Sequence, residues 1–184
     1  MLPELAEFVK QIFPSIDPYT AEQARKALEQ FEGDNNALVR NSLSFDCVQG
    51  DIFSEIPFVY IDDSGSEKTI ICEAQLISNS CDAENNDTLL FAAVRSLNDF
   101  PDNSFVSSIK NNRVFHALYF PDRLTKDKYV DFQLITTFSR TAFRNLVDEN
   151  LVHRMFTLTL TGYYMFICKL TVFLMRPESE EISR

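Results

Sequence analysis

The chain has 184 residues, of which 45% are hydrophobic, and it contains 17 Phe, four Gly and no Trp. This length fits one domain with a sizeable core, and the composition excludes repeat, collagen-like and low-complexity proteins. Twenty-seven acidic residues against 17 basic ones give a formal charge of −10. Because a negative surface repels phosphates, nucleic-acid binding would require a local basic patch that the linear sequence does not display.

The acidic excess is concentrated near the N-terminus. Residues 1–56 contain ten acids and four bases, a net charge of −6, whereas residues 141–184 contain five of each. We predict that this acidic region binds a basic protein partner. The predicted partner-binding residues are Glu29, Glu32, Asp34, Asp51 and Glu55. The simpler alternative is a well-solvated surface that keeps the protein in solution.

Residues 1–45 are predicted to form an N-terminal helical segment. Apolar residues recur every three or four positions from Leu5 to Ile12 and again from Ala24 to Phe31, which indicates two amphipathic helices. Asp17-Pro18 supplies a cap and a first-turn proline for the second helix. This pair of helices either covers the core or serves as a docking element.

Residues 46–140 are predicted to form a β-rich core. Phe58–Ile61 and Thr69–Ile77 flank the turn at residues 62–66, which predicts a hairpin. Three further β-rich runs follow, at residues 89–94, 114–120 and 129–138. Several short, closely spaced strands favour a small, bent antiparallel β-barrel.

Residues 141–184 are predicted to form a C-terminal helix and a charged tail. The apolar run from Leu158 to Met175 has 18 residues and includes Lys169. Apolar side chains within it repeat at helical spacing on one stripe, namely Tyr163, Phe166, Ile167, Leu170 and Leu174. This pattern predicts a helix docked on the core with Lys169 reaching outward, rather than a membrane span. The three segments are expected to form one compact α+β domain.

Candidate catalytic and metal-binding residues are few. Cys81-Asp82 follows a predicted strand, and His116 and His153 are the two histidines of the chain. A thiolate nucleophile needs a nearby base, and a zinc site needs closely spaced ligands, but the sequence has no CxxC or HxxxH spacing. We therefore predict no catalytic residue, no metal and no cofactor. Widely separated cysteines and an N-terminus unlike a signal peptide predict reduced thiols and a cytoplasmic location.

Short motifs occur in a characteristic order between Gly50 and Ser96. They are Gly50-Asp51-Ile52, Pro57, Ser64-Gly65-Ser66-Glu67, Leu76-Ile77-Ser78-Asn79 and Ala92-Ala93-Val94-Arg95-Ser96. In this order they resemble the PemK/MazF family of plasmid-maintenance and toxin proteins. The resemblance implies an SH3-like barrel, and of the site residues it carries over only Ser96. The alternative RNA-cleaving pair, Arg95 and Ser96, rests on the residues themselves, because a guanidinium binds phosphate and a Ser hydroxyl can donate to an oxyanion. However, the family's Arg-Pro after the hairpin turn is replaced here by Glu67-Lys68-Thr69, so the resemblance favours the fold more than the nuclease activity.

These observations together predict a non-catalytic interaction protein of a prokaryotic toxin–antitoxin, immunity or defence system, which binds a basic partner through its acidic surface. Two alternatives stay open. One is a MazF-like endoribonuclease that uses Arg95 and Ser96, and the other is a structural or phage-associated component. Oligomer formation is compatible with each of the three.

Overall fold

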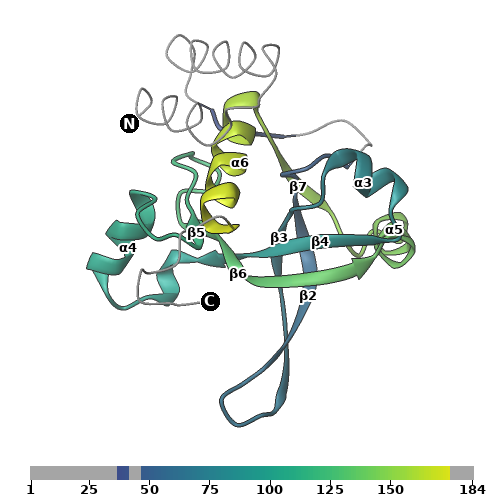
Figure 1. The fold of residues 1–184 in the computed structure, drawn as a ribbon, viewed down its shortest axis with the longest axis horizontal. Helices are drawn as coiled ribbons and strands as arrows, with labels where there is room; N and C mark the ends of the chain where they lie inside the picture. The colour runs from purple at the N-terminus through teal and green to yellow at the C-terminus, as the bar shows by residue number, and fades with distance from the viewer. Residues whose placement is uncertain (1–36, 42–46, 175–184) are drawn as a thin grey trace, which may run out of the picture.

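The structure, a computed structural model, describes residues 37–41 and 47–174. Within these residues the protein is a mixed α+β fold with one seven-stranded antiparallel sheet, in the order β1-β7-β2-β3-β4-β6-β5 (Figure 1). The α+β prediction is therefore confirmed. The two helices predicted before Gly33 and the predicted tail after Arg176 lie outside the described residues.

The strands are β1 (Val39–Arg40), β2 (Ile52–Ile61), β3 (Glu67–Leu76), β4 (Thr88–Ser96), β5 (Ala117–Leu118), β6 (Lys128–Ser139) and β7 (Arg154–Leu158). The helices are α3 (Ser80–Asn85), the 3₁₀ helix η1 (Leu97–Asp99), α4 (Asn103–Lys110), α5 (Arg140–Asp148) and α6 (Leu160–Leu174).

The sheet is strongly bent but open, so the predicted closed barrel is not what the described residues form. The ladder ends at β1 on one side and β5 on the other, and each of these strands is two residues long. Barrel closure requires two end strands long enough to pair with each other, which these are not. The bend comes with register shifts in β2 after Phe53 and between β4 and β6 after Ala92, since bulges increase local twist.

Both faces of the sheet are covered in the body of the molecule, because successive residues of a strand point to opposite faces. Ile52 belongs to a core beneath α6, where the Phe132 and Phe166 rings lie with centroids 6.1 Å apart. The next residue, Phe53, belongs to a second core beneath α5, where its ring meets that of Phe143 edge to face at 5.0 Å. Figure 1 shows α6 and α5 at different parts of the bent sheet.

The C-terminal region contains a strand that was not predicted. Residues 141–184 were expected to be helical, but β7 lies between α5 and α6 and pairs with both β1 and β2. It holds one end of the sheet together. The strand pairs with these distant partners, and it also carries a local β signal, because apolar residues alternate with Thr157 and Thr159 from Phe156 onward.

The long helix α6 packs on the core as predicted, with two differences in detail. Phe166 is fully buried, but Leu174 is 69% exposed, so the apolar stripe ends before it. Lys169 does not reach outward: its side chain is half-buried and its Nζ donates a hydrogen bond to the carbonyl of Asn112 at 2.8 Å. Burial lowers the pKa of Lys169 to about 8. In the described part of the chain, no helix has the length and apolarity needed to cross a membrane.

The hairpin of β2 and β3 continues beyond the rest of the sheet. β7 pairs with β2 at Ile52 and Phe53, and β4 pairs with β3 at residues 73–76. From Ile56 to Cys72 the two strands pair with each other and, among the described residues, with no third strand. We call residues 56–72 the arm. Figure 1 shows it projecting well away from the body of the molecule.

Candidate functional site

Most of the predicted acidic binding residues do not meet on one described surface. Glu29, Glu32 and Asp34 lie outside the described residues. Asp51 is fully buried, where it accepts hydrogen bonds from Thr157 Oγ1 at 2.6 Å and Val48 N at 3.1 Å and lies 3.2 Å from Arg154 Nη1. Burial raises the pKa of Asp51, and these contacts oppose that rise.

Asp51 is therefore a structural residue that ties β2 to β7, not part of a binding surface. The prediction placed it on the surface because a lone carboxylate in a linear sequence carries no sign of a buried partner 103 residues away. Glu55, by contrast, is exposed. It has a positive φ of 57° and lies in the β2 bulge at the root of the arm.

The alternative catalytic pair, Arg95 and Ser96, is engaged in structural contacts. Arg95 Nη1 lies 3.5 Å from the carboxylate of Asp131. Ser96 caps the following 3₁₀ helix, because its Oγ accepts a hydrogen bond from Asn98 N at 3.1 Å. The neighbouring Tyr129 is buried, which raises its pKa to about 12 and makes it a poor general base near neutral pH.

The candidate nucleophile and metal ligands lie on separate elements. Cys81 and Asp82 are exposed in the first turn of α3, which is capped by Asn79. His153 is exposed before β7, and His116 is half-buried before β5. Within the described residues, no three His, Cys, Asp or Glu side chains come together as a metal site.

The tip of the arm is a tightly hydrogen-bonded turn. Asp62 Oδ1 accepts hydrogen bonds from Ser64 N at 2.9 Å, Ser64 Oγ at 2.5 Å and Ser66 N at 3.0 Å. These bonds hold the pKa of Asp62 below its ordinary value. Gly65 has a φ of 77°, as is usual for the left-handed residue of a three-residue hairpin loop. The predicted turn is thus confirmed, and the tip is held in one conformation.

The two faces of the arm differ in exposure near its root, although Tyr60, on the same face as Phe58, is 40% exposed towards the tip. Ile56 and Phe58 point to the α5 side and are both fully buried. Val59, Ile61 and Ile71 point to the opposite side and are 57%, 65% and 64% exposed. We call these three residues the outer stripe. A row of β-branched side chains this exposed is unusual on a protein surface and is typical of binding sites.

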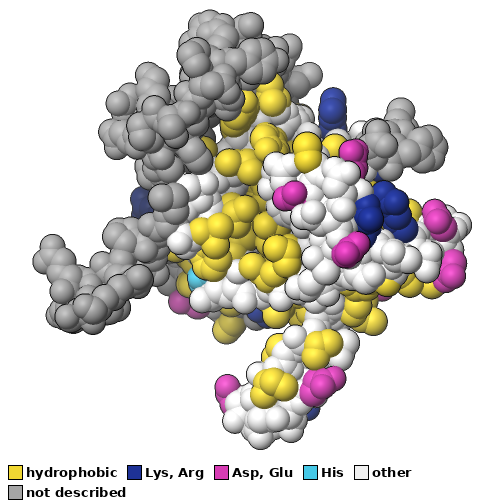
Figure 2. Space-filling view, turned by 45° about the vertical axis from the view of Figure 1, so that its right-hand side comes forward, with side chains coloured by type: hydrophobic (Ala, Val, Ile, Leu, Met, Phe, Trp, Pro, Cys, Tyr) yellow, Lys and Arg dark blue, Asp and Glu magenta, His cyan; other side chains and the backbone are white. Residues whose placement is uncertain are grey.

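Acidic residues surround the outer stripe. Residues 55–72 contain four carboxylates, Glu55, Asp62, Asp63 and Glu67, against one amine, Lys68, a net charge of −3. Lys68 lies 3.6 Å from Asp62, so it is already paired. Figure 2 shows the arm protruding from the body with hydrophobic and acidic side chains both exposed along it.

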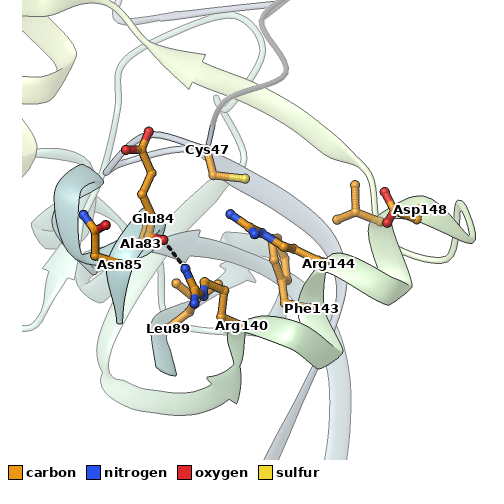
Figure 3. Close-up of a pocket in the computed structure, with 10 residues that line it drawn as sticks. Cys47, Ala83, Glu84, Asn85, Leu89, Arg140, Phe143, Arg144 and Asp148 are labelled. Atoms are coloured by element: carbon orange, nitrogen blue, oxygen red, sulfur yellow. Dashed lines mark hydrogen bonds between the residues drawn. The ribbon is translucent and has the colours of Figure 1, made fainter. Parts of the chain in front are cut away.

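A pocket of about 610 Å³ lies between α3 and α5. Arg140 and Arg144 line it from successive turns of α5, and Ala83 and Phe143 contribute apolar wall. In Figure 3 both arginine side chains extend from α5 towards α3, and Arg140 donates a hydrogen bond to the backbone carbonyl of Glu84.

Neither the arm's outer stripe nor this arginine pair was selected as a site from the sequence. The i, i+4 spacing of Arg140 and Arg144 was a usable signal for a shared helix face. The exposure of the stripe had no such signal, because alternating apolar residues in a strand ordinarily predict a buried face.

Comparison with known proteins adds no relative: no family model matches the chain, and no curated protein matches it significantly.

Proposed function

We propose that this is a non-catalytic interaction protein and that the arm is the element with which it binds a basic protein partner. The observation that carries the proposal is the outer stripe: three β-branched side chains are more than half exposed on a projecting, well-ordered hairpin. The stripe lies among carboxylates that give residues 55–72, the arm and the preceding Glu55, a net charge of −3. The partner's surface is therefore expected to be apolar at its centre and rich in Lys or Arg around it.

The apolar contact would supply most of the affinity. Burial of an aliphatic side chain contributes about 1.5–3 kcal/mol, so three half-exposed side chains can contribute several kcal/mol before the costs of association. A hairpin that is already ordered by its turn loses little conformational freedom on binding. The arm's unpaired strand edges also permit a partner strand to add to the hairpin through backbone hydrogen bonds.

The carboxylates would set the choice of partner and the rate of association. Charged residues at the rim of an interface speed up encounter with an oppositely charged partner and discourage others, and salt weakens both effects. The proposal keeps the hypothesis of an acidic binding surface that was drawn from the sequence. Among the described residues, we assign that surface to the arm. Of the residues predicted to bind the partner, Glu55 is on this surface and Asp51 is not.

The resemblance to PemK/MazF proteins supports a toxin–antitoxin, immunity or defence setting as part of this proposal. The endoribonuclease alternative has less support, because Arg95 is paired with Asp131 and Ser96 caps a 3₁₀ helix. A structural role would also use an exposed arm, but it predicts contact with further copies of the chain rather than with a basic partner.

The experiment is site-specific photo-crosslinking in cells, with the crosslinking residue placed at position 61 on the outer stripe. The matched control places it at position 151, since Leu151 is 54% exposed and lies outside the arm. A protein crosslinked from position 61 and not from position 151 would then be purified and titrated calorimetrically against the full-length chain at about 0.05 M and 0.5 M salt.

We expect that partner to be basic and its affinity to fall as salt rises. The double variant Asp63→Asn/Glu67→Gln should weaken binding mainly at low salt, while Asp62 is left in place because it orders the turn. Crosslinks of equal yield from both positions, or an affinity indifferent to salt, would contradict the proposal. Crosslinks to a second copy of the chain would favour the structural role instead.

A further inference from the structure

The pocket between α3 and α5 is a second feature with the character of a site. Its volume of about 610 Å³ lies within the range of small-molecule sites, roughly 300–1,000 Å³. Its wall is both apolar and charged, with Phe143 and Leu89 on one side and the guanidinium groups of Arg140 and Arg144 within reach of the same space. Phe143 is 2% exposed and belongs to the core, so this part of the wall is fixed.

The two arginines differ in how they are held. Arg140 is oriented by its bond to the Glu84 carbonyl, which joins α5 to α3 across the pocket. Arg144 makes no hydrogen bond or ion pair within the part of the chain that the structure describes, although it is one turn away on the same helix face. One guanidinium is thus positioned in advance, and the second retains all five of its N–H donors.

Two carboxylates of the described residues line the pocket without being paired with these arginines. Glu84 and Asp148 both line the pocket, but neither forms an ion pair with Arg140 or Arg144. Figure 3 shows the carboxylate of Glu84 directed away from Arg140, and Asp148 at the opposite end of α5 from Arg140. The positive charge is therefore concentrated between the two helices, with the acids at the margins.

From this arrangement we infer that the pocket binds a phosphate monoester of a small organic molecule. Guanidinium groups bind phosphate oxygens through paired N–H bonds, and two of them match the charge of a phosphate monoester, about −1.5 to −2 near neutral pH. A carboxylate would leave one of the two charges unmatched. The remaining volume, which Ala83 and Val147 also line, can hold a small organic body. This site is independent of the arm and of the proposed protein partner.

The test is to titrate the full-length protein with phenyl phosphate, inorganic phosphate and benzoate. NMR of the backbone amides locates the binding, and calorimetry measures the affinity. Phenyl phosphate should bind most tightly and should shift the amides of α3 and α5. Arg144→Gln should weaken its binding about tenfold or more, while leaving the fold intact because the side chain is exposed and forms no hydrogen bond or ion pair with the described residues. Arg123→Gln removes the same charge from an exposed position outside the pocket and should have no effect.

Four results would overturn the inference, of which the first three concern the site itself. These three are the absence of any amide shift in α3 and α5, unchanged affinity in Arg144→Gln, and tighter binding of benzoate than of phenyl phosphate. Equal losses in Arg144→Gln and Arg123→Gln would also overturn it, because they would show a general charge effect rather than a site.

Discussion

The body of the sheet and the arm are built from the same alternating strand pattern but differ in how many of their faces are covered. In the body, Ile52 and Phe53 point to opposite faces and both are buried, because α6 covers one face and α5 the other. In the arm, Phe58 is buried and its neighbour Val59 is 57% exposed, because no helix covers the outer side among the described residues. What lies opposite a strand, rather than the strand's own sequence, decides which of its apolar residues are available to a partner.

The largest expected effect is the difference in free energy of unfolding between an alanine substitution in the body and one in the arm. Phe166→Ala in the body should lower the free energy of unfolding by about 3–5 kcal/mol, since it removes a fully buried ring from the core beneath α6. Ile61→Ala in the arm should change it by about 0.5 kcal/mol or less, because that side chain is already in water. Urea unfolding measures both. A cost for Ile61→Ala near that of Phe166→Ala would show that the arm is covered after all.

A second test uses the half-buried amine of Lys169 on α6. The folded pKa of Lys169, about 8, is below the unfolded value near 10.5, so between these pH values the unfolded chain binds more protons. The destabilisation by Lys169 is therefore fully present below pH 8 and is removed as pH rises towards 10.5. Relative to Lys169→Met, the wild type should gain up to about 3 kcal/mol across this window.

The comparison between the two proteins in that test is necessary because other groups titrate in the same range. Burial raises the pKa of Cys72 and of Cys168 to about 11, and both thiols are present in the variant, so their contribution cancels. Unfolding of both proteins by urea at several pH values gives the result. A stability difference that does not change between pH 8 and 10.5 would mean that Lys169 is not desolvated by the packing of α6.

A third, smaller effect is expected where α6 begins. A Cβ at Gly162 would overlap the backbone carbonyl of Leu38, closer than real contacts allow. Gly162→Ala should therefore displace α6 from the segment before β1 and cost about 1–3 kcal/mol, although alanine ordinarily favours a helix. A thermal melt compared with that of Gly65→Ala, at a position with open space but a positive φ, separates overlap from backbone strain. Unchanged stability of Gly162→Ala would contradict the close approach.

The parts of the fold that sequence could predict are those fixed by local signals. The hairpin with its turn at Asp62, the strand cores of β4 and β6, and the docked helix α6 follow from alternation, turn residues and helical spacing. The burial of Asp51 could not be predicted in this way, because it depends on a partner far along the chain. The position of β7 between β1 and β2 also depends on distant partners, although its alternation of apolar residues with Thr was a local strand signal. The openness of the sheet also depends on how distant strands pair, so local signals do not predict it.

The same division applies to the candidate sites. The acidic character of the arm can be counted in the sequence, and the spacing of Arg140 and Arg144 can be read from it. The exposure of Val59, Ile61 and Ile71 cannot, because it results from the absence of a covering layer in the described fold. Sequence alone therefore predicts the acidic character of the proposed binding surface but not its position in the fold.

The most direct test of the account is to remove the outer part of the arm, which contains Val59 and Ile61 of the outer stripe. Asp62 N donates a hydrogen bond to Ser66 O, which closes the loop of the hairpin. Along an antiparallel hairpin, every second pair of opposite residues is hydrogen-bonded, so Phe58 and Ile70 form such a pair. A two-residue turn can connect a hydrogen-bonded pair. We would replace residues 59–69 by Asn-Gly and titrate the shortened protein against the partner found by crosslinking. The account predicts a folded protein, destabilised by about 1 kcal/mol or less, that no longer binds. A shortened protein that binds as tightly as the full chain would contradict it.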